Sequence, residues 1–264
     1  MPHTTCPPEL LALANRLADT SGDVIRQYYR SAFVVEEKTD QSPVTIADKK
    51  TEQALLAMLA QERPQDGVIG EEFGNARENA DYVWVLDPID GTRAFASGKP
   101  LFGTLIALLH EGVPVLGVID QPILKERWVG AVGHDTTFNG QKCRTRTCSQ
   151  LSDAIANLGP QAFPFGSEES LTPYRNVAKN AKTTTVGGDC YSYGLVASGH
   201  IDLCIEHDLK LYDYAALIPV IEGAGGFVTD WQGNKPTTTS NGQILAAGDI
   251  RLIQETIELI EGAL

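Results

Sequence analysis

Two aspartates stand directly after an apolar segment in residues 84–92, which read Trp-Val-Leu-Asp-Pro-Ile-Asp-Gly-Thr. Pro88 fixes its own φ angle and has no N–H to donate, so the turn between the aspartates is stiff. In such a turn the carboxylates of Asp87 and Asp90 and the main-chain carbonyl of Ile89 can converge. These hard oxygen ligands suit Mg²⁺ better than zinc. The alternative is that the aspartates only cap a helix.

The next two residues, Gly91 and Thr92, are suited to binding an anion. Gly91 lets the main chain approach a ligand closely, and the following amides can point at an anion if a helix begins there. The Thr92 hydroxyl can hold a water molecule or a phosphate oxygen. This segment therefore combines a candidate metal site with a candidate phosphate site.

Further carboxylates stand at the ends of other expected elements. Glu71 and Glu72 follow an apolar strand, Asp213 opens an apolar helix, and Asp48 follows a short extended segment. Each one alone is explained as well by solvent exposure or helix capping. Gathered at the tips of buried elements, they would repel one another strongly without cations. Two metal ions about 3.5–4 Å apart would neutralise them and clamp a phosphate.

The elements that must position these side chains alternate between helix and strand, which indicates stacked layers of helices and sheets. Asn139-Gly140 predicts a type I′ turn. The chain divides without a marked linker into lobes of about 1–145 and 146–264. The expected helices are residues 8–30, 47–61, 168–179, 191–198, 213–222 and 250–262. The expected strands are residues 44–46, 68–69, 83–86, 101–110, 113–119, 128–132, 154–158, 183–186, 201–206, 227–230 and 244–247.

Composition excludes several classes of protein. The chain has 264 residues, 42% of them hydrophobic and 21% charged, which is ordinary for a globular protein and argues against disorder or a coiled coil. A formal net charge of −13 repels nucleic acids and anionic membranes, so neither is an expected partner. The five cysteines form no CxxC pair and are expected to be reduced thiols. With no apparent signal peptide or apolar run of ~20 residues, we expect a cytoplasmic protein.

The motifs, taken in order, resemble those of the inositol monophosphatase family. They are Gly-Glu-Glu at 70–72, Asp-Pro-Ile-Asp-Gly-Thr at 87–92, and Tyr-Asp at 212–213 followed by Glu-Gly-Ala-Gly-Gly at 222–226. The segment at 44–48 and the Asn139-Gly140 turn also match the family. Lys38 and Asp40 stand where the family often has a Lys and an Asp. The resemblance spans nearly the whole chain.

This resemblance implies a Mg²⁺-dependent phosphomonoesterase with two or three ions per active site and a layered αβαβα fold, usually a homodimer. Water attacks the phosphorus in line, without a phosphoenzyme. The first lobe would hold the metals and the phosphate, and the second lobe the substrate. The implied roles are metal binding by Glu71, Asp87, the Ile89 carbonyl, Asp90 and Asp213; phosphate binding by Gly91 and Thr92; activation of water by Glu71, Thr92 and Asp48; and support close to the ligands by Glu72 and Lys38.

The substrate side departs from the inositol phosphatases of the family. Those usually have Gly-Thr/Ser-Ala and Trp-Asp where this chain has Gly188-Asp189 and Tyr212-Asp213, and both departures resemble the histidinol-phosphatase branch. Asp189 would favour the ammonium of histidinol phosphate, because an unpaired buried charge is costly. Glu206 matches the family's substrate-binding acid, and Gly188 is a third candidate substrate-binding residue.

Three alternatives remain open. Asp189 can instead be the N-cap of the helix that follows it. The substrate can be inositol 1-phosphate or another sugar-alcohol phosphate. Some family members act as partners of the transcription machinery, which the net charge of −13 and the intact ligand set disfavour here. Tyr191, Tyr193 and Tyr212 are expected in the core rather than stacked on substrate.

Overall fold

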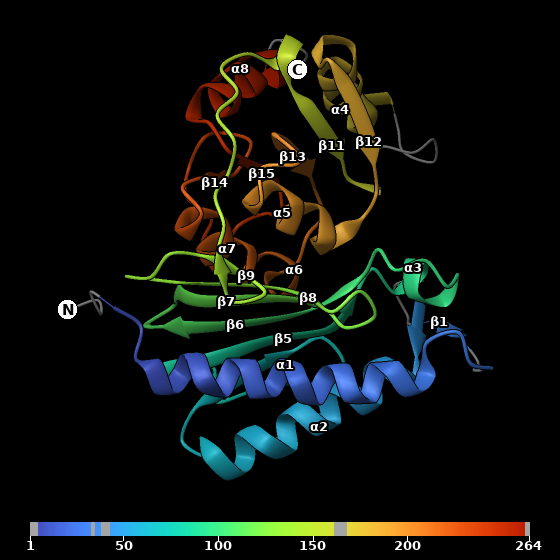
Figure 1. The fold of residues 1–264 in the computed structure, drawn as a ribbon, viewed down its shortest axis with the longest axis vertical. Helices are drawn as coiled ribbons and strands as arrows, with labels where there is room; N and C mark the ends of the chain where they lie inside the picture. The colour runs from blue at the N-terminus through green and yellow to red at the C-terminus, as the bar shows by residue number, and fades with distance from the viewer. Residues whose placement is uncertain (1–4, 33–34, 38–42, 161–167, 262–264) are drawn as a thin grey trace.

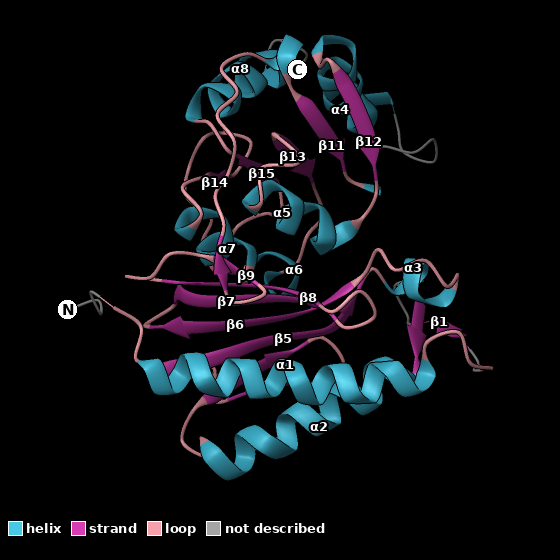
Figure 2. Ribbon diagram, viewed as in Figure 1, coloured by secondary structure: helices cyan, strands magenta, loops and turns pink. Residues whose placement is uncertain are grey.

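Five layers of helices and sheets make up the molecule (Figures 1 and 2). The computed structural model describes residues 5–32, 35–37, 43–160 and 168–261. In these ranges the layers follow one another as helices, an eight-stranded sheet, helices, a five-stranded sheet and helices. The expected αβαβα architecture is therefore confirmed. The division into lobes at about residue 145 stays a prediction.

The first layer consists of α1 (Pro8–Tyr28) and α2 (Ile46–Glu62). Apolar residues of α1 recur at helical spacing, so one face is buried against the first sheet. From α2, Leu55 and Leu59 join the same core, together with Trp84 and Leu86 of the sheet. A small hairpin of β1 (Val35–Glu37) and β2 (Pro43–Thr45) precedes α2 and places its N-terminus.

The first sheet is antiparallel except where β3 runs parallel to β5. Its two faces pack against different helical layers, which explains the long apolar run of β5. Its spatial order is β10 (Gln141–Lys142), β9 (Thr137–Phe138), β8 (Glu126–Ala131), β7 (Val113–Gln121), β6 (Gly103–His110), β5 (Tyr82–Asp90), β3 (Gly67–Gly70) and β4 (Gly74–Ala76). A short helix, α3 (Thr92–Ala96), follows β5 directly.

The middle layer contains α5 (Asp189–Ala197), α6 (Leu211–Tyr214) and α7 (Leu217–Gly223). It lies between the two sheets and packs against both. The spatial order of the second sheet is β12 (Thr183–Val186), β11 (Ile155–Leu158), β13 (Leu203–Glu206), β15 (Ile244–Ala247) and β14 (Phe227–Thr229). The outer layer is α4 (Glu168–Asn180) and α8 (Ile250–Glu261), and a 3₁₀ turn, Leu151–Asp153, leads into β11.

Two expected elements have different bounds in the structure, and four short strands, β1, β4, β9 and β10, were not expected. The expected helix 213–222 is two helices, because Pro219 has no N–H to donate to the carbonyl of Ala215 and the hydrogen-bond ladder breaks there. The strand expected at 83–86 extends through Asp90, and β4 was not expected at all.

Asn139 and Gly140 both have positive φ, as the type I′ prediction requires. No helix in the described ranges is long and apolar enough to cross a membrane.

Candidate active site

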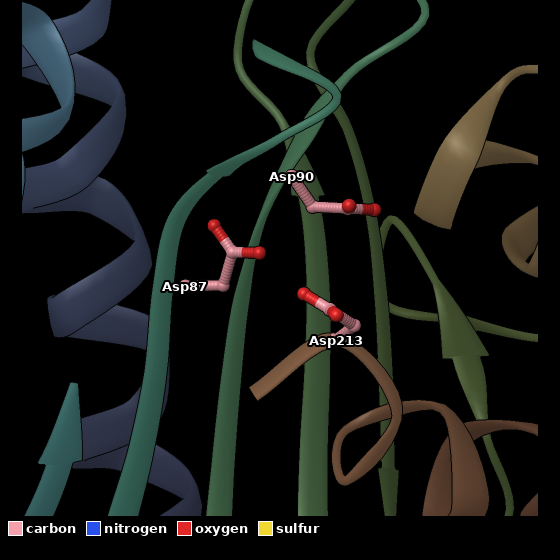
Figure 3. Close-up of side chains that lie close together, drawn as sticks. All are labelled: Asp87, Asp90 and Asp213. Atoms are coloured by element: carbon pink, nitrogen blue, oxygen red, sulfur yellow. The ribbon is translucent and has the colours of Figure 1, made fainter. Parts of the chain in front are cut away.

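Three aspartates from distant parts of the chain meet above the end of β5. Asp87 and Asp90 belong to β5, and Asp213 belongs to α6 in the middle layer. Each contributes one carboxylate oxygen to a group in which all the oxygens lie within 4.8 Å of one another. Figure 3 shows the three side chains pointing toward a common space. An all-oxygen set of this kind suits a hard divalent cation such as Mg²⁺.

An irregularity at the end of β5 aims the two aspartates at this space. Its pairing with β6 shifts register between Asp87 and Asp90, where Pro88 cannot contribute a ladder hydrogen bond. The carbonyl of Pro88 instead accepts a hydrogen bond from the Thr104 hydroxyl at 2.8 Å. The N–H of Ile89 donates to Asp87 Oδ1 at 3.0 Å, which fixes the carboxylate within the turn.

The alternative that Asp87 and Asp90 cap the helix next to them is wrong. The N-cap of α3 is Gly91, whose φ of 88° lies in the left-handed region that favours glycine. Asp90 does accept a helix amide, but from another part of the chain: the N–H of Cys190, in the first turn of α5, donates to its Oδ2 at 2.6 Å. This bond ties the end of β5 to the middle layer.

Parallel pairing places Glu71 beside Asp87. Gly70 pairs with Leu86 across β3 and β5, and the N–H of Glu71 donates to the carbonyl of Leu86 at 3.2 Å. Glu71 and Asp87, the residues that follow this pair, therefore lie at the same end of the two strands. The charge of Glu71 raises the pKa of Asp87, which shows that the two carboxylates are neighbours.

Asp48 caps a helix and also lies against Thr92. Its Oδ2 accepts hydrogen bonds from the main-chain N–H of Thr45, at 2.8 Å, and from the Thr45 hydroxyl, at 2.5 Å, so it caps α2. Its Oδ1 lies 3.4 Å from the Thr92 hydroxyl, which also lies 3.1 Å from the Ile89 carbonyl. The side chain of Asp48 is fully buried. The predicted water-activating residues Asp48 and Thr92 are thus in contact.

Asp213 likewise combines capping with a place in the cluster. Its Oδ2 accepts a hydrogen bond from the N–H of Lys210 at 2.6 Å, where α6 begins. Asp213 also contributes one carboxylate oxygen to the group that it forms with Asp87 and Asp90. The short helix therefore holds the carboxylate in one orientation.

Next to the metal cluster lies a cavity with a volume of about 530 Å³. Of the three predicted substrate residues, Asp189 and Glu206 line it, whereas Gly188 is not among its lining residues. Asp189 and Glu206 face it together with Asp90, Thr92 and Asp213. Asp189 lies against the predicted phosphate site, because a Cβ on Gly91 would be 2.8 Å from its Oδ2. The alternative of an Asp189 N-cap is wrong, since Gly188 holds that position and Asp189 is the first helical residue.

The cavity is strongly acidic. Among the described residues that line it, one cation, Arg93, stands against six acids: Glu71, Asp90, Asp189, Glu206, Asp208 and Asp213. Burial raises the pKa of Asp87 and of Asp90 well above the usual range, and neighbouring acids raise both further. Burial also raises the pKa of Asp213 to about 7 and that of Glu206 to about 8. These carboxylates are ones that a bound cation would stabilise in the charged form.

Glu72 and Lys38 were predicted to support the metal ligands, and the structure describes only Glu72. The N–H of Glu72 donates to Glu52 Oε2 at 2.8 Å, so Glu72 belongs to the turn that carries Glu71. Lys38 lies outside the described residues, as does Asp40.

Sequence reasoning missed Glu52 and left Tyr193 without a role. Glu52 stands one helical turn after Asp48, and this i, i+4 spacing on a helix that begins at the site was the available signal. Tyr193 stands at the same spacing after Asp189. It is buried, as expected, yet it also lines the cavity.

Comparisons with known proteins agree with this geometry. A model of the inositol monophosphatase family matches residues 7–263. The chain is 49% identical over 260 residues to the chloroplastic bifunctional phosphatase IMPL2 of Arabidopsis thaliana, covering 95% of this chain and 74% of the relative. It is 34% identical over 243 residues to a histidinol-phosphatase of Chlorobaculum parvum, covering 89% and 91%. A solved inositol monophosphatase from Zymomonas mobilis shares 46% identity and superposes with a TM-score of 0.87, covering 96% and 98%.

The fold and the acidic site are those of a metal-dependent phosphatase. The chain belongs to the inositol monophosphatase family, and it is a phosphoric monoester hydrolase. The family is metal-dependent and typically uses Mg²⁺, and the cluster of Asp87, Asp90 and Asp213 can bind a metal.

Proposed function

We propose that this protein hydrolyses histidinol phosphate to histidinol and phosphate, a step of histidine biosynthesis. The observation that carries the proposal is the position of Asp189, which is half-buried, and of Glu206, which is buried, in the cavity that Asp90 and Asp213 of the metal cluster also line. With no cation but Arg93 among the described lining residues, these acids favour a substrate with a positive charge of its own. Histidinol phosphate has an ammonium and an imidazole, whereas inositol phosphate has neither.

Two or three Mg²⁺ ions are the cofactor we propose, bound by Glu71, Asp87, the Ile89 carbonyl, Asp90 and Asp213. The donor set fits, because it is made of hard oxygens whose repulsion needs divalent charge to offset it. When bound, Mg²⁺ supplies charge that stabilises the phosphate in the transition state and lowers the pKa of a coordinated water.

Thr92 and Asp48 orient the attacking water. The Thr92 hydroxyl can donate its proton to Asp48 or to the Ile89 carbonyl, which leaves its lone pairs to accept a hydrogen bond from water. Burial raises the pKa of Asp48 to about 6, so near neutral pH this group can both accept and release a proton. Glu71, which follows β3 next to Asp87, is the second proposed acceptor. The attacking water gives a proton to Asp48 or Glu71 as its oxygen bonds to phosphorus and the ester P–O bond breaks, and the leaving alkoxide takes a proton from a solvent water molecule.

The phosphate is held at the start of α3. The amides of Gly91 and Thr92 lie beside the metal cluster, and Gly91 leaves the main chain open to a close approach. The phosphate end is then held by metals and amides, so Asp189 and Glu206 are left to bind the other end of the substrate. A charge-assisted hydrogen bond to the ammonium is strong in such a buried setting.

Inositol 1-phosphate is the second candidate substrate, favoured by the 46% identity to the Zymomonas mobilis inositol monophosphatase. The two proposals are separated by measuring phosphate release from L-histidinol phosphate and from inositol 1-phosphate, side by side, with Mg²⁺. We expect kcat/KM to be at least roughly 100-fold higher for L-histidinol phosphate, since each buried acid left unpaired costs about 1–3 kcal/mol. Equal values, or a preference for inositol 1-phosphate, would contradict the proposal.

We also propose that the protein is cytoplasmic and that it forms a homodimer. Light scattering in solution tests the homodimer.

A further inference from the structure

Glu206 lies among negative charges and next to one hydroxyl. It ends β13 and is 3% exposed. Burial raises its pKa, the charges of Asp189 and Asp213 add to the rise, and the nearby Tyr193 hydroxyl opposes it. Glu206 and Tyr193 also line the same cavity.

The Tyr193 hydroxyl is buried without a regular hydrogen-bond partner. The side chain is 1% exposed, and its oxygen meets no partner within normal distance and angle limits, although it lies close enough to Glu206 to affect its pKa. A buried hydroxyl left without a partner is destabilising, so a partner within reach is favoured. A small rotation of the Glu206 carboxylate toward the hydroxyl would satisfy it.

Helix α5 holds Tyr193 firmly in this place. At its N-terminus the N–H of Cys190 donates to Asp90 at 2.6 Å. Past its last residue, the Trp128 indole N–H donates to the Ser198 hydroxyl at 2.7 Å. Because the helix is tied at both ends, the ring of Tyr193 has little freedom to move.

Helix α5 brings two side chains to the cavity. Asp189, its first residue, and Tyr193, four residues later, both line it, as does Glu206. Asp189 borders the phosphate site at Gly91.

We propose that Tyr193 is a positioning residue for substrate specificity: its O–H donates to the Glu206 carboxylate and aims the other carboxylate oxygen at a cationic nitrogen of the leaving group. This inference rests on the proposed function, because it assumes an ammonium-bearing substrate. The ammonium supplies the positive charge that the described cavity walls lack near Glu206. The substrate class is therefore a phosphate ester of an amino alcohol.

The test is Tyr193→Phe, which removes the hydroxyl and keeps the ring. The matched control is Tyr191→Phe, which removes a hydroxyl from the same helix that bonds to Glu126 and does not line the cavity. Both variants are assayed with L-histidinol phosphate and with its deamino analogue, 3-(imidazol-4-yl)propyl phosphate. Thermal unfolding verifies that each variant is folded.

Tyr193→Phe is expected to raise KM for L-histidinol phosphate by roughly 10- to 150-fold, the range for a hydrogen bond to a charged group. Its kcat should change little, and KM for the deamino analogue should stay the same. In a Glu206→Gln background, the same substitution should add almost nothing, because the group through which Tyr193 acts is gone. Tyr191→Phe should leave both KM values unchanged.

The outcomes separate this inference from the proposed function. If the wild-type protein does not distinguish the two esters, recognition of the ammonium fails, and with it the proposed function. If the wild type distinguishes them and folded Tyr193→Phe does so equally well, only the role of Tyr193 is overturned. Equal losses on both esters, or an undiminished loss in the Glu206→Gln background, would mean a structural role and overturn it too. If Tyr193→Phe does not fold, 3-fluorotyrosine at position 193 alone should lower KM for L-histidinol phosphate, and an unchanged KM would overturn the inference.

Discussion

The carboxylate of Glu52 fills the space next to Gly70 that a side chain there would need. A Cβ on Gly70 would lie 2.1 Å from Glu52 Oε1, closer than any real contact. The same carboxylate accepts hydrogen bonds from the N–H groups of Glu72, at 2.8 Å, and of Phe73, at 2.9 Å. Helix α2 therefore fixes the turn that carries Glu71, although Glu52 itself does not line the cavity.

We expect Gly70→Ala to weaken Mg²⁺ binding. The new methyl group would displace Glu52, and the turn would lose the acceptor for two of its amides. Loss of a group that orients metal ligands typically costs about 10- to 100-fold in metal affinity. The measurements are calorimetric Mg²⁺ titration and the rise in melting temperature on adding Mg²⁺. Gln53→Ala, on the exposed side of α2, is the control and should change neither. Wild-type Mg²⁺ affinity in Gly70→Ala would show that the turn does not depend on Glu52.

Asp87→Asn and Asp90→Asn should each abolish turnover while the fold survives. The amide keeps one oxygen to accept the hydrogen bonds from Ile89 and Cys190, but the charge that would bind metal is lost. Phosphate release and thermal unfolding are measured together, with Asp135→Asn as an exposed control. EDTA should abolish the phosphatase activity of the wild-type protein, and added Mg²⁺ should restore that activity. Full activity after exhaustive chelation would exclude the metal-dependent mechanism.

Thr92→Ala should lower kcat by roughly 10²- to 10⁴-fold, the range for a positioned proton-transfer group. The substitution keeps the main-chain amides proposed to bind phosphate and removes only the hydroxyl that contacts Asp48. Thr92→Ser restores the hydroxyl and should recover most of the rate. Steady-state kinetics decide the matter: a raised KM with unchanged kcat would make Thr92 a phosphate contact and nothing more.

Asp189→Asn should raise KM for L-histidinol phosphate by about 10- to 150-fold, because a hydrogen bond to a charged group is replaced by a neutral one. Asn is chosen because Asp189 has a φ of 42°, in the left-handed region that Asn tolerates. Glycerol 2-phosphate, which has no ammonium, should hardly be affected. Equal losses on the two esters would indicate a folding or phosphate-binding defect instead.

Without metal, the protein should become less stable as pH rises. Burial raises the pKa of Glu52 to about 7 and that of Glu206 to about 8, against about 4 in an unfolded chain. Between these limits the folded state binds more protons than the unfolded state, so the free energy of unfolding falls with rising pH. This fall in the free energy of unfolding begins near pH 4 and is complete above about pH 8.

Melting temperatures measured in EDTA across this range should therefore fall with pH, by about 2–4 °C for each kcal/mol lost. Added Mg²⁺ should remove most of the dependence, since it stabilises the charged carboxylates. Glu206→Gln should flatten part of the curve in EDTA. A melting temperature that rises between pH 5 and pH 8 in EDTA would contradict the assignment of raised pKa values.

Local sequence determined much of this protein. The apolar spacing of α1 and α2 and the alternation of helix and strand predicted the layered fold. Carboxylates at strand ends predicted an oxygen-rich site, because residues that follow neighbouring strands meet at one edge of a sheet. Glu71 and Asp87 meet in this way through the pairing of Gly70 with Leu86. Asp48 was identified by its place after a strand, and its double role in capping and in contact with Thr92 follows from that place.

Tertiary structure alone decided which groups complete the site. Asp213 reaches Asp87 and Asp90 because the middle layer packs against the first sheet, and no local pattern encodes that distance. The hydrogen bond from Cys190 to Asp90, the fit of Glu52 beside Gly70 and the approach of Tyr193 to Glu206 also join segments far apart in the chain. Side-chain periodicity shows which face of an element is buried. The neighbour it meets depends on how whole layers pack, which is a property of the assembled fold.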